Sequence, residues 1–308
     1  MVTIVHGRHQ HLRGQLDGLH RAVPGPDGHV VVALGDPDVR AVVGPRAQVV
    51  EIAVPDDGEL PLASGRNAGA DAAVAAGAEL LIFLDVDCIP APRLVAHYAA
   101  AAQDPAHADA ILCGPVAYLP PADPAGHNRA GYDLDDYDPA GYDLNGHDVA
   151  GYDLNGYDVA GYDLDRLTDL ATAHPARPNP APGVVEVAHD RRLFWSLSFA
   201  VTAATWARVG GFHPGYVGYG GEDTDFVEQA HAAGVGMRWV GGASAFHQHH
   251  RVSVPPVEHV DAIVRNAHIF HERWGWWPMI GWLDAFADLG LAAHDPSHGW
   301  RATAPARP

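Results

Sequence analysis

The chain has 308 residues, of which 47% are hydrophobic, enough to bury the core of one large domain or two small ones. Its formal net charge is −19, and about half of that excess falls within residues 130–165, which hold ten aspartates and no basic residue. The composition argues against nucleic-acid binding through phosphate contacts, because such binding needs clustered basic residues and this chain contains no lysine.

Cysteine usage and the amino terminus predict a cytoplasmic protein. Cys88 and Cys113 are the only cysteines, so no disulfide framework is required. The apolar run at residues 1–5 is too short for a signal peptide, and no run reaches the length of a membrane span.

The first 113 residues predict strands that alternate with helices. Apolar runs predict strands at 2–5, 30–34, 49–54, 80–84 and 110–113, and helical spacing predicts helices at 11–20, 64–78 and 93–102. This order is typical of a largely parallel sheet with right-handed crossovers.

The strand at 80–84 is followed by Asp85-Val86-Asp87. Strands of a parallel sheet deliver their ligand groups at the carboxyl end, and two carboxylates one residue apart can turn toward one hard cation. A solvated aspartate turn explains the same residues, and the pattern alone does not decide between them.

Residues 130–169 form four tandem ten-residue units, each beginning Ala-Gly-Tyr-Asp. A pentapeptide β-helix is disfavoured because the inward position would hold Tyr or His. We predict a mobile acidic loop grown by duplication, which could gate the site, with calcium binding as the alternative.

After a Pro-rich segment, the sequence again predicts strands and helices. Strands are expected at 194–202 and 237–240, a short helix near Trp206, and helical structure over 257–291. Gly220-Gly221-Glu222-Asp223-Thr224-Asp225 should open a helix, since acids favour the first turn. Histidines at 247, 249 and 250 follow the later strand. Taken singly, the acids could be helix caps and the histidines solvated surface.

In combination and in this order, the motifs resemble those of a GT-A glycosyltransferase. The resemblance is to the family 2 enzymes and to the carboxyl-terminal module of the galactosyltransferases and polypeptide N-acetylgalactosaminyltransferases. It spans nearly the whole chain except the repeats and the last dozen residues. The matching segments are Arg8-x-x-His11-Leu12, Gly65-Arg66-Asn67-Ala68-Gly69, Phe83-Leu84-Asp85-Val86-Asp87-Cys88, and Gly210-Gly211-Phe212 with the Gly-Gly-Glu-Asp motif.

The resemblance implies a GT-A (Rossmann-like) α/β fold: a mixed, mostly parallel sheet flanked by helices, with a helical carboxyl-terminal extension. It divides the chain into four parts. These are a nucleotide-sugar-binding half (1–125), the acidic repeat and Pro-rich insertion (126–183), an acceptor and catalytic half (184–254) and a helical aromatic extension (255–308).

The resemblance also implies a role for each motif residue. Arg8, Asp36, Arg66 and Asp85 would bind the donor nucleotide. Asp87 and His247 would bind the metal, with His249 as a second choice; an oxygen-rich site with one imidazole suits Mn²⁺ or Mg²⁺ better than zinc.

On the acceptor side, the resemblance makes Asp223 the general base and places Gly221 and Glu222 in the sugar- and acceptor-binding site, with Glu222 holding sugar hydroxyls. A carboxylate near the acceptor hydroxyl lowers the barrier independently of any resemblance. Tyr219 stands where the resembling enzymes often have Trp. Trp195 is a further sugar-binding candidate, and a core aromatic is the equal alternative.

The predicted function is metal-dependent transfer of a sugar from a nucleotide-sugar donor, with UDP-sugar expected, to an acceptor hydroxyl with inversion. The acceptor is an unidentified carbohydrate, lipid or small molecule. A nucleotidyltransferase and a non-catalytic sugar-binding module are the alternatives. The first usually needs a Gly-rich phosphate loop with a basic residue, whereas only His6-Gly7-Arg8 follows the first strand here.

Overall fold

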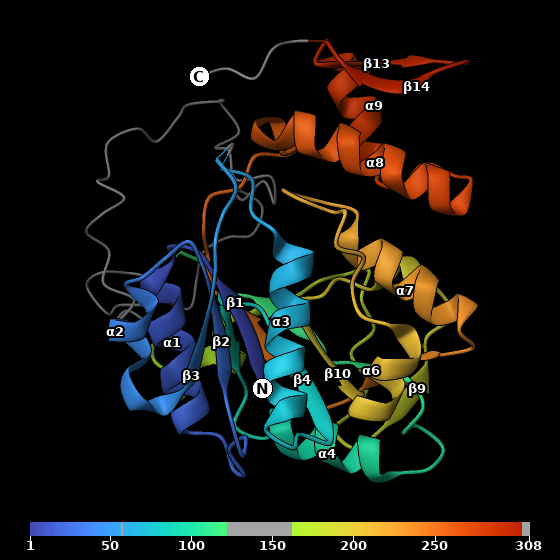
Figure 1. Ribbon diagram of the computed structural model, residues 1–308. Helices are drawn as coiled ribbons and strands as arrows, with labels where there is room; N and C mark the ends of the chain where they lie inside the picture. Colours follow the sequence, from blue (N-terminus) through green and yellow to red (C-terminus); the bar gives the residue numbers. More distant parts are fainter. Residues whose placement is uncertain (57, 122–161, 304–308) are drawn as a thin grey trace.

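The computed structural model describes residues 1–56, 58–121 and 162–303. An eight-stranded sheet with helices on both faces forms its centre (Figure 1). The strands are β1 (Val2–Val5), β2 (Val30–Leu34), β3 (Gln48–Ile52), β4 (Leu80–Leu84), β6 (Ile111–Cys113), β9 (Val185–Val187), β10 (Ser198–Thr202) and β11 (Met237–Val240).

The strand order is β3-β2-β1-β4-β10-β6-β11-β9. Strands β3, β2, β1 and β4 are parallel, β10 runs antiparallel to β4 and β6, β11 is parallel to β6, and β9 is antiparallel to β11. The predicted mixed, mostly parallel sheet is therefore confirmed. Its central strands are apolar throughout because helices cover both of their faces.

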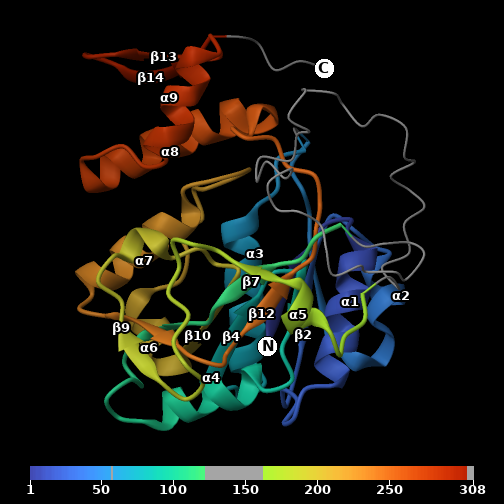
Figure 2. The same ribbon diagram turned by 180° about the vertical axis from the view of Figure 1, so that it is seen from behind.

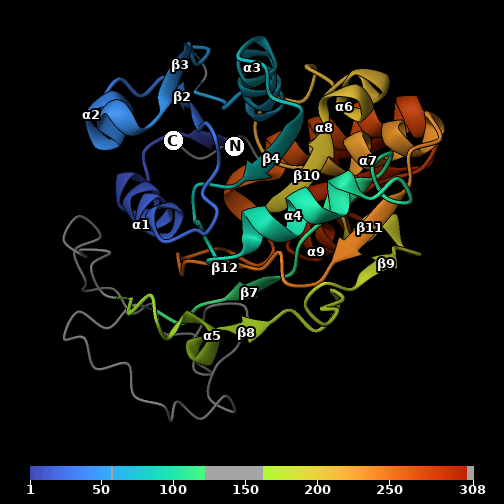
Figure 3. The same cartoon turned by 90° about the horizontal axis from the view of Figure 1, so that it is seen from below.

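Helices α3 (Leu62–Ala75), α6 (Ala203–Val209) and α7 (Glu222–Ala232) cover one face of the sheet, and α1 (His9–His20), α2 (Val39–Val43) and α4 (Leu94–Gln103) cover the other (Figure 3). Helix α1 turns Leu12 and Leu16 toward Val31. Helix α3 lies close to the sheet because Gly69 has no side chain, and a Cβ there would collide with Val2.

A second, small sheet lies beside the carboxyl end of β4. Its strands are β5 (Cys88–Pro90), β7 (Val116–Tyr118), β8 (Thr172–Ala173) and β12 (Ala245–His247), in the order β5-β12-β7-β8. In its register, His247 pairs with Cys88 of β5 and with Tyr118 of β7. This pairing brings the end of β12 next to the Asp85–Asp87 turn.

The part of the predicted insertion that the structure describes begins at Tyr162 and packs onto the second sheet. Helix α5 (Leu167–Leu170) and strand β8 follow, and the view from behind shows α5 beside β7 and β12 (Figure 2). The predicted mobile loop over most of the repeat array lies outside the described residues. The domain boundaries remain predictions.

The carboxyl-terminal segment packs as a separate layer above α7 (Figure 1). A 3₁₀ turn at Val257–His259 precedes α8 (Val260–Trp274) and α9 (Ile280–Asp288). A hairpin, β13 (Ala292–Asp295) and β14 (Gly299–Ala302), follows these helices and was not predicted. Within the described ranges, no helix has the length and apolar character needed to cross a bilayer.

Candidate active site

The two aspartates after β4 point to different partners. A turn is closed by the Cys88 N–H, which donates to the Asp85 carbonyl at 2.9 Å. The Asp85 carboxylate accepts from Arg66 at 3.2 Å, whereas that of Asp87 accepts from Arg8 at 3.1 Å. The turn therefore separates the two carboxylates into two neighbouring roles.

Asp87 lies with two histidines in a group suited to a metal ion. Its carboxylate oxygens are 3.5 Å from His247 Nε2 and 3.4 Å from His250 Nε2, and the three ligand atoms lie within 4.8 Å of one another. Burial raises the pKa of Asp87, but His247, His250 and Arg8 outweigh it and hold that pKa far below its usual value. The carboxylate stays ionised.

The structure does not place His249, our second choice, in this group. Its carbonyl faces His11 Nε2 at 3.4 Å, and its N–H donates to the Tyr162 hydroxyl at 3.3 Å. Successive residues after a strand point in different directions, so His250 rather than His249 returns to the site. Predicting this from the sequence would have required knowing how the chain bends after β12, and no sequence pattern predicts that bend.

One carboxylate and two imidazoles change the expected preference for a metal. Magnesium favours oxygen ligands and water, whereas imidazole suits Mn²⁺ and other transition ions. The donor set therefore fits Mn²⁺ better than Mg²⁺. Zinc also accepts such a set.

Gln15 of α1 holds the Asp85–Cys88 turn in place. This residue was not identified from the sequence. Its side chain is fully buried, and its amide nitrogen lies 2.7 Å from the Asp85 carbonyl and 3.3 Å from that of Cys88. Its amide oxygen accepts from the Thr3 hydroxyl at 3.0 Å. A glutamine beside the leucines that form the buried face of a helix was the only signal for this role.

Arg66 joins the two halves of the site. Its guanidinium is buried in α3 and lies 3.2 Å from Asp85 on one side and 3.2 Å from Glu222 on the other. Burial and the neighbouring Asp87 raise the pKa of Asp85 to about 6, against the opposing charge of Arg66. Arg66 thus fixes the carboxyl end of β4 against the start of α7.

Arg8 and Asp36 lie at the carboxyl ends of β1 and β2. Asp36 accepts from the Gly7 N–H and lies against His9 Nε2, both at 2.8 Å. Burial raises the pKa of Asp36, but these two contacts outweigh it and lower that pKa. Arg8 has a φ of 48°, a conformation that non-glycine residues rarely adopt and that often marks a functional site.

The Gly-Gly-Glu-Asp motif begins α7 as predicted. Gly221, with φ of 91°, precedes the helix, and Glu222 and Asp223 occupy its first turn. Asp223 accepts from the Thr224 N–H at 2.7 Å, and in the described part of the chain it forms no ion pair. Burial and the charge of Glu222 raise the pKa of Asp223 to about 7. A carboxyl group with this pKa is suited to accept a proton near neutral pH.

The carboxyl-terminal extension holds the loop before this motif. Asn266 of α8 is buried, and its amide nitrogen donates to the carbonyls of Val217, Tyr219 and Gly220 at 2.8–3.2 Å. On the other side, Asn67 of α3 makes two hydrogen bonds to the backbone of Phe212, each at 2.8 Å. These amides lock the two glycine-rich turns onto neighbouring helices.

Asp225, the last acid of the motif, has a structural role. It is fully buried, and one of its oxygens accepts from Arg273 Nε at 2.6 Å, Trp274 Nε1 at 2.7 Å and the Tyr216 hydroxyl at 3.2 Å. Asp225 therefore fastens α8 to α7.

The two aromatic candidates lie in different surroundings. Tyr219 stacks on His259 and Trp282 of the extension, with ring centroids 4.7 and 5.8 Å apart. Burial raises the pKa of Tyr219, and so do the charges of the nearby acids, Asp223 and Glu222 first among them.

Trp195 precedes β10, which begins only at Ser198. Its ring packs against His174 and under the guanidinium of Arg177, and none of its described contacts is with Glu222 or Asp223.

Comparison with known proteins supports the fold. Residues 187–252 match the family model described as the N-terminal domain of galactosyltransferase. Staphylococcus aureus TarS, residues 1–349, has a TM-score of 0.50 at 11% identity; the alignment covers 87% of this chain and 63% of that one. The fold is GT-A.

Two further solved structures match over most of this GT-A chain. The mannosyltransferase PcManGT of Pyrobaculum calidifontis, in complex with GDP-Man and Mn²⁺, has a TM-score of 0.47 at 14% identity and covers 94% of this chain and 69% of its own. GalNAc-T7 with UDP, GalNAc and Mn²⁺ has a TM-score of 0.48 at 14% identity, with coverages of 89% and 50%. No curated protein matches the sequence.

Proposed function

We propose that this chain is a metal-dependent glycosyltransferase that moves a sugar from a nucleotide-sugar donor, with UDP-sugar expected, to an acceptor hydroxyl with inversion. The observation that carries this proposal is the position of Arg66 between Asp85 and Glu222. Arg66 thereby connects the turn that carries Asp87, the aspartate of the metal group, to the first turn of α7, which carries Asp223 with its raised pKa. A transferase needs both groups within reach of one sugar.

The donor side is formed by the ends of β1, β2 and β4. Asp87, His247 and His250 would hold Mn²⁺, which when bound would neutralise the charge of the donor diphosphate. Arg8 lies beside Asp87 and would face the same phosphates, while Asp36 and Asp85 would face the nucleoside.

The catalytic step assigned to the protein is proton removal. Asp223 would accept the proton of the acceptor hydroxyl as its oxygen bonds to the anomeric carbon. The bond from that carbon to the phosphate oxygen then breaks, and its electron pair leaves with the diphosphate. Attack from the opposite side of the ring to the leaving group gives inversion.

The acceptor side is bounded by Tyr219 with His259 and Trp282. Aromatic rings beside a carboxylate are typical of sites that bind sugar rings, which stack their C–H faces on the aromatic surface while a carboxylate accepts from hydroxyls. A carbohydrate acceptor therefore fits this wall best.

One experiment separates this function from a nucleotidyltransferase and from a non-catalytic sugar-binding module. The protein is incubated with UDP-, GDP- and dTDP-sugars and Mn²⁺, and release of the nucleoside diphosphate and free sugar is measured. Slow, metal-dependent hydrolysis of one donor is expected. Release of sugar 1-phosphate, with transfer of the nucleoside monophosphate group, would indicate a nucleotidyltransferase. Metal-dependent binding without turnover would indicate a binding module.

The Asp223→Asn variant tests the role of the base. Turnover should fall by at least ~100-fold while metal-dependent donor binding is retained, because the amide keeps the shape but cannot accept the proton. Asp71→Asn, on an exposed turn of α3, is the matched control. Loss of donor binding in Asp223→Asn would instead assign this residue to the donor site.

A further inference from the structure

The last repeat unit of the acidic array is docked in a groove on the second sheet. The Tyr162 hydroxyl donates to the Pro120 carbonyl at 2.7 Å and accepts from the His249 N–H. Leu164 packs against a buried cluster, and Asp165 forms an ion pair with Arg21 at 2.8 Å. A tyrosine, a leucine and an aspartate of one unit are thus each matched by a different part of the groove.

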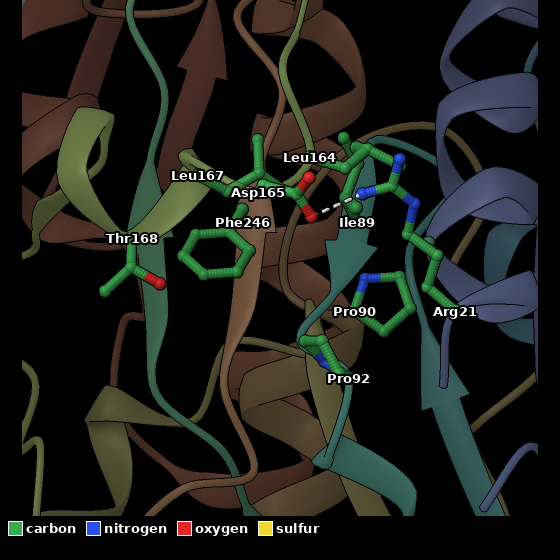
Figure 4. A pocket seen from close by; sticks show the side chains of 10 residues that line it. Arg21, Ile89, Pro90, Pro92, Leu164, Asp165, Leu167, Thr168 and Phe246 are labelled. Atoms are coloured by element: carbon green, nitrogen blue, oxygen red, sulfur yellow. Dashed lines mark hydrogen bonds and ion pairs between the residues drawn. The ribbon is translucent and has the colours of Figure 1, made fainter. Parts of the chain in front are cut away.

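The groove lies between the end of α1 and the second sheet. Figure 4 shows Arg21 reaching Asp165, with Ile89 of β5, Phe246 of β12, Leu164 and Leu167 lining the same pocket. A cavity of about 190 Å³ remains beside the docked chain. The docked unit therefore binds through the Tyr162 hydroxyl, the Leu164 side chain and the Asp165 carboxylate, and part of the groove stays unfilled.

The array contains a second copy of the docked residues, 162–165, and of the glycine before them. Residues 161–165 read Gly-Tyr-Asp-Leu-Asp, and residues 131–135 read the same. The units at 141–145 and 151–155 end in Asn, which cannot form the ion pair with Arg21. The contacts in the groove therefore distinguish two of the four units from the other two.

We propose that this groove is a binding site for the Gly-Tyr-Asp-Leu-Asp unit, and that residues 131–135 are its second occupant. Exchange of one unit for the other would shift the register of the chain by three repeats and keep the Tyr, Leu and Asp contacts, while Asp136-Tyr137-Asp138 would replace Arg166-Leu167-Thr168. This proposal does not depend on the enzymatic activity, since the groove lies on α1, β5 and β12, away from Asp223.

A peptide experiment tests the recognition. The full-length variant Tyr132→Ala/Leu134→Ala/Tyr162→Ala/Leu164→Ala removes both matching units from competition. A fluorescent peptide of residues 130–135 should then bind saturably, and a peptide of residues 140–145, which differs only by Asn in place of the last Asp, should bind about twofold to fivefold more weakly, the effect of one exposed ion pair. Adding Arg21→Ala should equalise the two peptides. Absence of saturable binding, or a preference that survives Arg21→Ala, overturns the proposal.

A crosslinking experiment tests the exchange within one chain and does not require that multiple variant. Cysteines are placed at Pro92, which lines the same cavity as Asp165, and at Asp136, which follows the second unit. Asp165→Asn weakens the resident unit. The native cysteines Cys88 and Cys113 are buried and do not compete.

A short bifunctional thiol reagent should join Pro92→Cys to Asp136→Cys within one chain, more often than to Gly146→Cys in the matched control. Pro92→Cys with Arg166→Cys is the positive control. Equal crosslinking at 136 and 146, or crosslinks only between two chains, would contradict the second occupant.

Discussion

The Gln15 amide nitrogen lies 2.7 Å from the carbonyl oxygen of Asp85, and this contact fixes the turn that carries the metal-site aspartate. The backbone of the turn is also held by the Asp85 N–H, which donates to the Leu197 carbonyl at 2.9 Å, and by the Gln248 N–H, which donates to the Asp87 carbonyl at 2.7 Å. The buried Gln15 side chain acts together with these backbone contacts. Buried amides of this kind raise specificity because each unmade hydrogen bond is costly.

Gln15→Leu should weaken Mn²⁺ binding and stability together. The leucine removes one partner from the carbonyls of Asp85 and Cys88 and from the Thr3 hydroxyl, which keeps His29 Nε2 at 3.0 Å, at a cost of about 1–3 kcal/mol in the free energy of unfolding. Calorimetric titration with Mn²⁺ and denaturant unfolding measure the two effects. Gln103→Leu, at the exposed end of α4, should change neither. Unaltered Mn²⁺ affinity in Gln15→Leu would show that the Asp85–Cys88 turn keeps its conformation without the Gln15 side chain.

His250→Ala should raise the Kd for Mn²⁺ by at least ~10-fold, and His249→Ala should leave it within about twofold. Only His250 lies with Asp87 and His247, while His249 contacts the protein through its backbone. The two neighbouring variants are each other's control in one titration. Equal losses would mean that the segment after β12 rearranges when the metal binds.

Asp223 should give the protein a pH dependence of both activity and stability. Its pKa is raised to about 7 by burial and by Glu222, while Arg66 and Thr224 oppose the rise. For activity, kcat/KM should increase nearly tenfold per pH unit below pH 7 and level off above it, since the base must be ionised.

The stability that Asp223 contributes has the opposite pH dependence, because it falls as pH rises. A carboxyl group with a folded pKa above its unfolded value contributes stability that is present below the unfolded pKa, near 4, and is lost as pH rises through 7. Asp223→Asn removes this loss. The variant should therefore match the parent only below about pH 4 and exceed it by about 1–2 kcal/mol at pH 8.5, a figure that allows for partial solvent screening. Parallel melting curves that do not converge at low pH would assign the raised pKa to another group.

The sequence allowed the sheet, the order of its helices and the approximate position of each acid to be predicted, because these depend on local apolar runs and on residues directly after them. Asp85, Asp87, Glu222 and Asp223 follow a strand or open a helix, so short-range patterns locate them. Gln15, Asn266 and Arg66 were harder because their role lies in contacts between elements far apart in the chain. Arg66 was assigned to the nucleotide by resemblance, and the structure adds that two carboxylates already flank it.

The terminal hairpin was missed for a related reason. Residues 292–302 contain too few apolar positions to predict strands, and Trp300 becomes buried only against α8 and α9. His250 was missed because its direction depends on how the chain bends after β12. Tertiary packing decides both.

Asn266→Ala should lower turnover without weakening donor binding. The Asn266 side chain is the common partner of three carbonyls in the loop that leads to Asp223, and Gly218, Gly220 and Gly221 give this loop little stiffness of its own, since all three have positive φ. Removing the amide leaves the loop free to shift Tyr219 and the start of α7, and a displacement of about 1 Å can reduce a rate ~100-fold. We expect kcat to fall by about tenfold or more, with the Kd for Mn²⁺ and donor unchanged, because Asp87 and its histidines lie on other elements. Asn179→Ala, at an exposed position, is the matched control. A loss of donor affinity equal to the loss of kcat would show that the extension supports the whole sheet edge and not the acceptor side alone.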